Sequence, residues 1–226
     1  MSEPKMKASS KNGLIEFEFD HNLLKMIEKE LGNLKSESRK VLKNAVNRAA
    51  RQAKTNLAKK AQETYSVKKT RFTKAMATKN ATIAKPEATI KVTGEQMELK
   101  DFKVSPATYQ SGRNRPSVTK AKVLLSSSLK PLDSRAKAFI TRFSNGHITL
   151  VQRIPGQTYK TKRGQKARKG KYGKRADMTF LKKLLSNSIP KMVGSQERVY
   201  GIVEPDIYDN LMRNIQSEIR RVLNNR

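Results

Sequence analysis

The sequence of 226 residues contains no cysteine. This absence excludes a disulfide framework, a zinc site built from thiolates and a cysteine nucleophile, and it is typical of proteins of a reducing cytoplasm. The sequence also lacks an apolar run of the roughly 20 residues that a membrane-spanning helix needs, and Met1 to Lys11 lacks the apolar core of a signal peptide. We therefore expect a protein that is made in the cytosol and either stays there or leaves it inside a particle.

Large apolar residues are scarce. Leu, Ile, Val and Phe together make up 49 of the 226 residues, only just above the level of about 20% below which a highly charged chain is typically disordered. The formal net charge is +30 and the mean hydropathy is -0.73. Self-repulsion opposes compaction at such a charge unless a polyanion or an acidic partner neutralises it. We expect a modest core and a stability that depends on assembly.

Hydrophobic periodicity predicts a strand and then helices in the first third of the chain. Leu14 to Asp20 alternates between apolar and acidic residues, which is typical of a half-buried strand. Asp20 can cap a short helix through Leu31, which Gly32 can end. The strongest helical repeat runs from about Asn33 to Thr64, and its buried stripe becomes alanine-rich after Ala45. Its outer surface is predicted to be a basic face made of Arg39, Lys40, Lys43, Arg48, Arg51, Lys54, Lys59 and Lys60.

Shorter elements are predicted in the middle of the chain. Ser66 could cap a second helix that carries Phe72 and Met76. Strands are expected around Ala88 to Val92, at Glu98 to Val104 and at Lys122 to Ser126, and Ser105 to Lys120 has the turn residues of a long loop. Ala136 to Phe143 and His147 to Arg153 flank Ser144, Asn145 and Gly146, which predicts a β-hairpin because Asn and Gly accept a positive φ.

The last third is predicted to begin with Pro155 to Ala176, an extended excursion with several glycines and few large apolar residues. We expect a short helix at Phe180 to Leu185, a strand at Val199 to Val203 and a final helix that Pro205 opens. The predicted fold class is α+β, with long N-terminal helices packed on a small antiparallel sheet, a β-hairpin, long basic loops and a C-terminal helix. Residues 1–12 should form a flexible arm and residues 13–226 a single domain, with extended loops at about 105–120 and 155–176.

The sequence gives little support for catalysis. His21 and His147 are far apart in the chain, and His147 lies beside a turn where a polar residue is ordinary. Gly164 to Tyr172 resembles a phosphate loop only superficially, since five residues instead of four separate the two glycines and Tyr172 replaces the required Ser or Thr. Asp206 and Asp209 fall where the last helix is expected to begin, which favours a structural role. We assign no catalytic residue, cofactor site or metal site.

The charge distribution is more informative. Between Asp101 and Asp177 there are 19 Lys or Arg residues and one acidic residue, Asp133, so this third of the chain carries a net charge of +18. Glycine-rich basic segments can follow a phosphate backbone closely and release its counterions. We favour this role over a solvated loop or a loop bound to an acidic protein face, and we expect no sequence specificity. The candidate phosphate-facing residues are Lys160, Lys162, Arg163, Lys166, Arg168, Lys169, Lys171, Lys174 and Arg175.

An ordered series of short segments resembles the minor tail protein Z family of long-tailed phages. The resemblance covers about residues 14 to 224, and its specificity lies in the order and spacing of the segments. The segments are Asn47-Arg48, Glu63 to Lys69, Ala81-Thr82, Pro86, Ala88, Ile90 to Val92, Gly94, Leu99, Phe102, Ala138-Phe139, Asn145 to His147, Arg153 and Ile189 to Gly194, followed by a C-terminal helix.

The resemblance implies a virion component at the head-proximal end of the tail, which completes the tail and connects it with the head and its DNA. It supplies no catalytic residues. It implies several copies, six in the commonest tail symmetry, around a channel, with the tail terminator, the tail tube or head–neck connector proteins as partners. Genomic double-stranded DNA is a further candidate partner, and a membrane is not.

Two other classes of protein compete with this interpretation. A ribosomal or nucleoid-like protein that binds nucleic acid without sequence specificity would fit the pI near 10.5, but the ordered family-like series argues against it. A basic nuclease would need clustered carboxylates to hold metal ions, and the basic third of the chain contains only Asp133.

Overall fold

The computed structural model describes residues 14–17, 21–110, 114, 116–132, 136–158 and 179–224. The chain divides into two compact units, one made of residues 1–96 with 187–226 and the other of residues 97–186. We call them the helical unit and the β unit. The expected arm at residues 1–12 lies outside the described residues, and cooperative folding as one domain stays a prediction.

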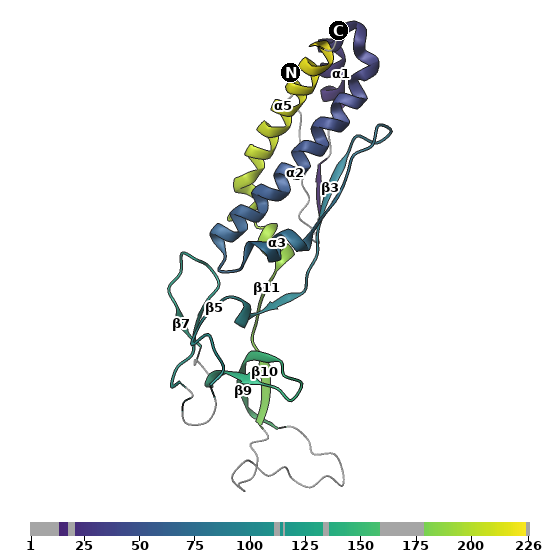
Figure 1. The fold of residues 1–226 in the computed structure, drawn as a ribbon. Coiled ribbons are helices and arrows are strands. Elements are labelled where there is room, and N and C mark those ends of the chain that lie inside the picture. Colours follow the sequence, from purple (N-terminus) through teal and green to yellow (C-terminus); the bar gives the residue numbers. More distant parts are fainter. Residues whose placement is uncertain are drawn as a thin grey trace, which may run out of the picture. The chain divides into compact units, whose positions relative to one another are not determined.

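Two long helices dominate the helical unit (Figure 1). Helix α2 spans Ser38–Thr64 and α5 spans Tyr200–Asn224. They run antiparallel, since Asn44 contacts Glu218 near one end while Thr64 contacts the carbonyl of Arg198 near the other. Helix α1, His21–Leu31, precedes α2 and is joined to it by the 3-10 helix η2, Gly32–Glu37. Gly32 has a φ of 51°, which ends α1 as expected.

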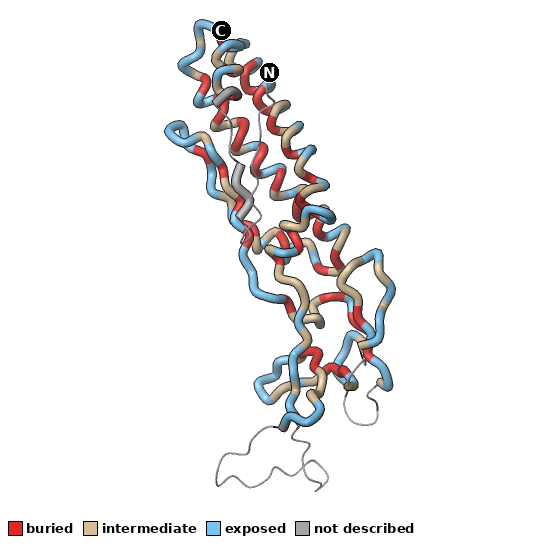
Figure 2. Tube along the Cα trace, turned by 180° about the vertical axis from the view of Figure 1, so that it is seen from behind, coloured by how far each residue is buried: buried red, intermediate tan, exposed pale blue. Residues whose placement is uncertain are grey.

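The core of the helical unit follows the apolar stripe of α2 (Figure 2). Six of the buried α2 residues are alanines, so the neighbouring elements can approach its axis closely. The predicted helix over residues 33–64 is confirmed from Ser38 onward, whereas its first residues form η2 because Leu34 leaves helical geometry, with φ -98° and ψ 21°. The buried residues of α2 are Ser38, Val41, Leu42, Ala45, Val46, Ala49, Ala50, Ala53, Leu57, Ala58 and Ala61.

A small antiparallel sheet packs against α2. Its strands are β1 (Leu14–Phe17), β3 (Ala88–Val92) and β2 (Met76–Lys79), in that order across the sheet. Strand β3 buries Ala88, Ile90 and Val92 on alternate positions, which gives the sheet one core face. Helices α3 (Lys69–Ala75) and α4 (Ile189–Val193) complete the unit. The predicted α+β class, with long helices on a small antiparallel sheet, is confirmed.

The β unit contains two three-stranded antiparallel sheets. One has the order β5-β6-β7, formed by Lys103–Ser105, Lys120–Lys122 and Lys130–Pro131. The other has the order β10-β9-β8, formed by Thr179–Lys183, Ile148–Thr158 and Ala138–Arg142. Val104, Ala121, Ile140 and Leu150 form the core cluster of this unit. Strands β4 (Gln96–Glu98) and β11 (Leu185–Ser188) form a separate two-stranded sheet.

The predicted hairpin is confirmed as β8 and β9. Ala138 pairs with Gln152 and Arg142 with Ile148 across it. Gly146 has a φ of 82°, and the amide of His147 donates a 3.0 Å hydrogen bond to Asn145 Oδ1. The residues that accept a positive φ thus lie at the turn, as expected.

Two predictions for the last third of the chain are wrong. Residues 180–185 do not form a helix, because Phe180 belongs to strand β10, which pairs with the long strand β9. Residues 199–203 do not form a strand, because α5 already begins at Tyr200 and Pro205 lies inside it. Tyr200, Val203 and Ile207 are all buried at helical spacing, so the apolar stripe extends the helix beyond the proline.

Several predicted boundaries also shift. The second helix begins at Lys69 without a side-chain cap, so Ser66 does not cap it. A 3-10 turn at Leu99–Asp101, η3, interrupts the strand expected at residues 98–104. The strand expected at residues 122–126 is wrong beyond Lys122, because the strand in this region, β6, spans Lys120–Lys122, where it pairs with β5. Residues 155–158 extend β9, while 159–178 lie outside the described residues, as do 18–20.

Candidate functional site

The outer surface of α2 is strongly basic. The helix carries eight Lys or Arg residues and one acidic residue, Glu63. None of the eight basic side chains is buried, whereas the alanine-rich stripe beneath them is. The basic face predicted from the sequence is therefore confirmed. Its position follows from the helical repeat, which places the apolar residues on one side and the charged residues on the other.

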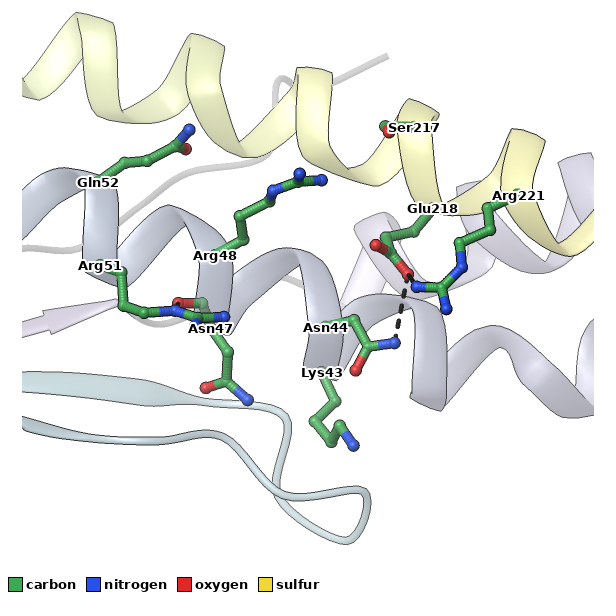
Figure 3. A pocket seen from close by; sticks show the side chains of 9 residues that line it. All are labelled: Lys43, Asn44, Asn47, Arg48, Arg51, Gln52, Ser217, Glu218 and Arg221. Atoms are coloured by element: carbon green, nitrogen blue, oxygen red, sulfur yellow. Dashed lines mark hydrogen bonds and ion pairs between the residues drawn. The ribbon is translucent and has the colours of Figure 1, made fainter.

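A polar groove lies between this basic face and α5 (Figure 3). It has a volume of about 930 Å³. Helix α2 lines one side and one turn of α5 lines the other, and the lining contains four cationic side chains and a single carboxylate. The lining residues are Lys43, Asn44, Asn47, Arg48, Arg51, Gln52, Ser217, Glu218 and Arg221.

Glu218 is the buried acid of the groove. The residue is only 8% exposed. Asn44 Nδ2 donates a 3.2 Å hydrogen bond to its Oε2, and a terminal nitrogen of Arg221 lies 3.6 Å from the same oxygen. Buried carboxylates require such partners because the charged group loses its hydration on folding. Glu218 is therefore held by one neighbour from each helix.

Side-chain amides hold the rest of the groove in place. Asn214 Nδ2 donates a 2.9 Å bond to Gln52 Oε1, which links α5 to α2. Asn47 forms two bonds with the backbone of Ala81: its Nδ2 donates to the carbonyl at 3.1 Å, and its Oδ1 accepts from the amide at 2.7 Å. This pair ties the loop after β2 to α2. The groove is thus held by hydrogen bonds to three separate segments of the helical unit.

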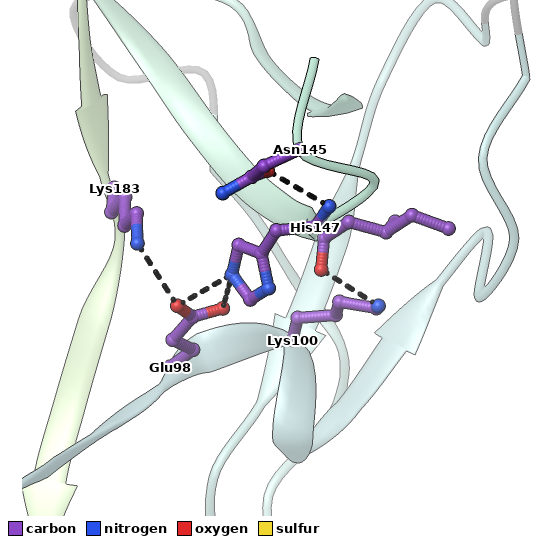
Figure 4. A network of polar contacts seen from close by, with 6 residues as sticks. Glu98, Lys100, Asn145, His147 and Lys183 are labelled. Atoms are coloured by element: carbon purple, nitrogen blue, oxygen red, sulfur yellow. Dashed lines mark hydrogen bonds and ion pairs between the residues drawn. The ribbon is translucent and has the colours of Figure 1, made fainter. Parts of the chain in front are cut away.

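A second polar cluster lies within the β unit (Figure 4). His147 Nε2 is 2.9 Å from Glu98 Oε1, and Lys183 Nζ is 3.4 Å from the same oxygen. Partial burial alone would raise the pKa of Glu98, but the neighbouring side chains, His147 and Lys183 among them, hold the pKa below its ordinary value. Lys100 Nζ adds a 2.8 Å bond to the carbonyl of Ile148.

This cluster ties the hairpin turn to β4 and β10. The ring of His147 also stacks on Phe143, with centroids 6.5 Å apart. The imidazole thus lies between a carboxylate and an aromatic ring that fix its position, and this geometry favours a structural role for His147. His21 is the first residue of α1, in the other unit.

The carboxylates that the sequence analysis considered on the last helix do not form a functional site. Asp206 and Asp209 are exposed and lie in the second and third turns of α5, so the expected placement at the helix start is wrong. Among the described residues, no group of three or more His, Cys, Asp or Glu side chains could hold a metal ion. Within the same residues, no helix is long and apolar enough to cross a membrane.

The nine candidate phosphate-facing residues all lie in 159–178, outside the described residues, as does the phosphate-loop-like segment at 164–172. The candidates are Lys160, Lys162, Arg163, Lys166, Arg168, Lys169, Lys171, Lys174 and Arg175. Their role stays a prediction.

Sequence reasoning missed the groove because its walls are far apart in the chain. Asn44 and Glu218 are separated by 174 positions. One local signal was present: Glu218 falls three residues after Ile215 and seven after Leu211, on the apolar stripe of α5. A carboxylate on an apolar stripe predicts a buried polar contact.

A sequence model of the family described as Prophage minor tail protein Z matches residues 24–225. No curated protein and no solved structure matches the chain.

Proposed function

The chain belongs to the prophage minor tail protein Z family, and we propose that this phage tail structural protein works at the head-proximal end of the tail. There it would complete the tail and help to join it to the head. The match of the family over nearly the whole chain carries the proposal. The structural role of the family favours a non-enzymatic protein, which is assembled into virions in the bacterial cytoplasm.

The charge supports a position near DNA. A net charge of +30 on a chain with a small core opposes compaction unless an anionic partner compensates it. The end of the tail that meets the head is where genomic DNA passes. We propose several copies, six in a hexameric ring, around that path, with the tail terminator, tail tube or head–neck connector proteins as neighbours. Any contact with DNA would be independent of sequence.

The alternative function, a ribosomal or nucleoid-like protein, has the same basic charge in its favour. Copurification separates the two, since the partner would be virion proteins in one case and ribosomes or free DNA in the other. The family membership favours the virion.

The experiment that tests the proposal removes the gene from the phage and restores it from a plasmid. Without the protein, we expect electron micrographs to show full heads and separate tails, and with it joined particles. Quantitative mass spectrometry of purified particles should give a low copy number typical of a ring. Absence from the particle, or the hundreds of copies of a tube or capsid protein, would contradict the proposal.

The DNA part of the proposal has its own test. Replacing Lys166, Arg168, Lys169 and Lys171 with Gln should lower the slope of log affinity against log salt, since each lost phosphate contact removes roughly 0.9 from it on duplex DNA. Tails should still assemble, while head joining or DNA delivery fails. A full salt slope together with lost ring assembly would show that the segment binds protein instead.

A further inference from the structure

In the groove between α2 and α5, the side-chain oxygens that link the elements lining it already accept hydrogen bonds. Oε2 of Glu218 accepts from Asn44 and lies beside Arg221. Gln52 Oε1 accepts from Asn214, and the amide of Asn47 is paired at both ends with Ala81. These contacts close the groove's own polar network around Glu218.

Its donors, by contrast, are largely unused. Within the described chain, Lys43 Nζ and the guanidinium of Arg48 have no hydrogen-bond or ion-pair partner. Arg51 uses only its Nε, which donates a 3.2 Å hydrogen bond to the carbonyl of Asn47, so its terminal nitrogens have no partner among the described residues. All three side chains line the groove, and Figure 3 shows them on one helix, with Arg48 extending toward α5 and with Arg51 and Lys43 extending away from α5 in this view. The groove therefore offers an excess of charged donors to a ligand that brings acceptors.

Guanidinium groups match carboxylates and phosphates equally well, because both anions accept two parallel N–H bonds. The shape of the groove separates the two. The axes of packed helices lie only about 8–10 Å apart, so the furrow above their contact is narrow and admits side chains or a single chain segment. A DNA duplex, whose major groove alone is about 12 Å wide, is too broad to enter it. The volume of about 930 Å³ suits a short peptide segment.

The buried acid also disfavours a polyphosphate. Duplex DNA carries a charge about every 1.7 Å along its axis, so a phosphate backbone that followed the groove would bring phosphates close to the Glu218 carboxylate. A protein segment can place carboxylates opposite Arg48 and Arg51 and an uncharged residue over Glu218. Arg48 and Arg51 are three positions apart on α2, and such residues are neighbours on a helix surface.

We propose that the groove between α2 and α5 docks an acidic segment of a second protein, with carboxylates bound by Arg48, Arg51 and Lys43. In a virion, that protein is a neighbouring subunit. Such docking is independent of where in the tail the chain lies, and the groove would then contact protein rather than DNA.

The test uses the full chain and a short synthetic peptide with glutamate at every third position and alanine between. Because the protein has no cysteine, Ser217→Cys places one environment-sensitive fluorophore in the groove, and Ser144→Cys places one in the β8–β9 turn. The peptide should change the Ser217 signal saturably and leave the Ser144 signal unchanged. A response of both labels would mean general adsorption and would overturn the proposal.

Matched charge variants then locate the contact. Lys43→Gln, Arg48→Gln and Arg51→Gln together should weaken peptide binding by about tenfold or more, because charge-assisted contacts are lost. The control combines Arg39→Gln, Lys40→Gln and Lys59→Gln, which remove the same charge from exposed positions of α2 outside the groove. The control should weaken binding by less than about threefold, as expected of screened surface charges. Equal losses in the two triple variants would overturn the assignment.

Two further measurements separate peptide binding from a folding defect and from phosphate binding. The single variant Arg48→Gln changes an exposed side chain that has no partner among the described residues, so the variant should fold normally and still bind the peptide measurably more weakly. A duplex oligonucleotide should compete poorly at the Ser217 label. If the duplex binds there more tightly than the peptide, and the groove variant abolishes that binding, the groove is a phosphate site and the proposal is wrong. The gene-deletion test of the tail position can succeed or fail independently.

Discussion

The contact between Asn44 and Glu218 gives a quantitative test of how the groove is built. Replacing Asn44 with Leu removes the amide that donates to Glu218 Oε2 at 3.2 Å. Arg221 remains, but its nitrogen is 3.6 Å away and its side chain is 68% exposed. The substitution therefore leaves a carboxylate, on a side chain that is 11% exposed, with only one mobile, hydrated partner.

The expected cost follows from that geometry. An acceptor that loses its donor inside a protein destabilises the fold by about 1–3 kcal/mol. Because the groove is open on one side and Arg221 stays, we expect the lower part of the range, about 1–2 kcal/mol. For a chain of 150–250 residues, each kcal/mol shifts Tm by about 2–4 °C, so Tm should fall by roughly 2–8 °C.

A double-mutant cycle separates this contact from a general effect of leucine. Replacing Asn44 and Glu218 together with Leu removes both partners, and such pairs are often nearly neutral. We expect a coupling energy of about 1 kcal/mol or more, measured by urea denaturation followed by circular dichroism. Gln62→Leu, at an exposed position of α2, is the control. If Asn44→Leu lowers the free energy of unfolding equally with and without Glu218, the Asn44 amide does not stabilise the Glu218 carboxylate, and the assignment of this donor to Glu218 is wrong.

Three further predictions address other parts of the chain. Gly201→Ala should destabilise by about 1–3 kcal/mol in urea, although Gly→Ala in a helix usually stabilises, because the added Cβ would collide with the carbonyl oxygen of Gln196; a gain in stability would contradict that contact. The pKa of Glu98 is lowered from 4.5, so its ionised form stabilises the fold above that pH and the contribution disappears as the pH falls through the lowered value. Glu98→Gln should therefore cost about 0.2–1 kcal/mol at neutral pH and little in acid, and a cost independent of pH would refute this. Burial and the neighbouring carboxylate of Glu204 raise the pKa of Tyr200, so an absorbance titration of the folded protein should show one late tyrosine that Tyr200→Phe removes.

The elements that the sequence predicts well have local signals. The stripe of α2 repeats over many turns, and the β8–β9 hairpin has Asn145 and Gly146 at its turn. The failures occur where a short apolar run fits two structures. Phe180 and Leu181 pair with β9, a partner that sequence periodicity does not reveal. Pro205 marks a helix start in most sequences, but here the burial of Tyr200 and Val203 extends α5 past it.

The candidate site also has one part that the sequence predicts and one part that it does not. The basic face of α2 is predictable because every residue of it lies on one helix. The groove needs α5 as a second wall, and nothing local to Asn44 indicates that Glu218 will face it. Only the place of Glu218 on the apolar stripe indicates a buried contact, and it does not identify the partner.

One helix thus connects the core, the charge and the docking site. The small residues of α2 let α5 pack closely, and this packing buries Glu218 beside the basic face. The groove then carries four cations and one engaged acid on a chain with a net charge of +30. An acidic segment that binds only the folded helical unit stabilises it in proportion to the logarithm of its concentration. It also removes part of the self-repulsion that opposes compaction. Docking and folding of the helical unit should therefore be coupled, so the glutamate peptide should raise the Tm of the wild-type chain and raise that of the groove variant by clearly less.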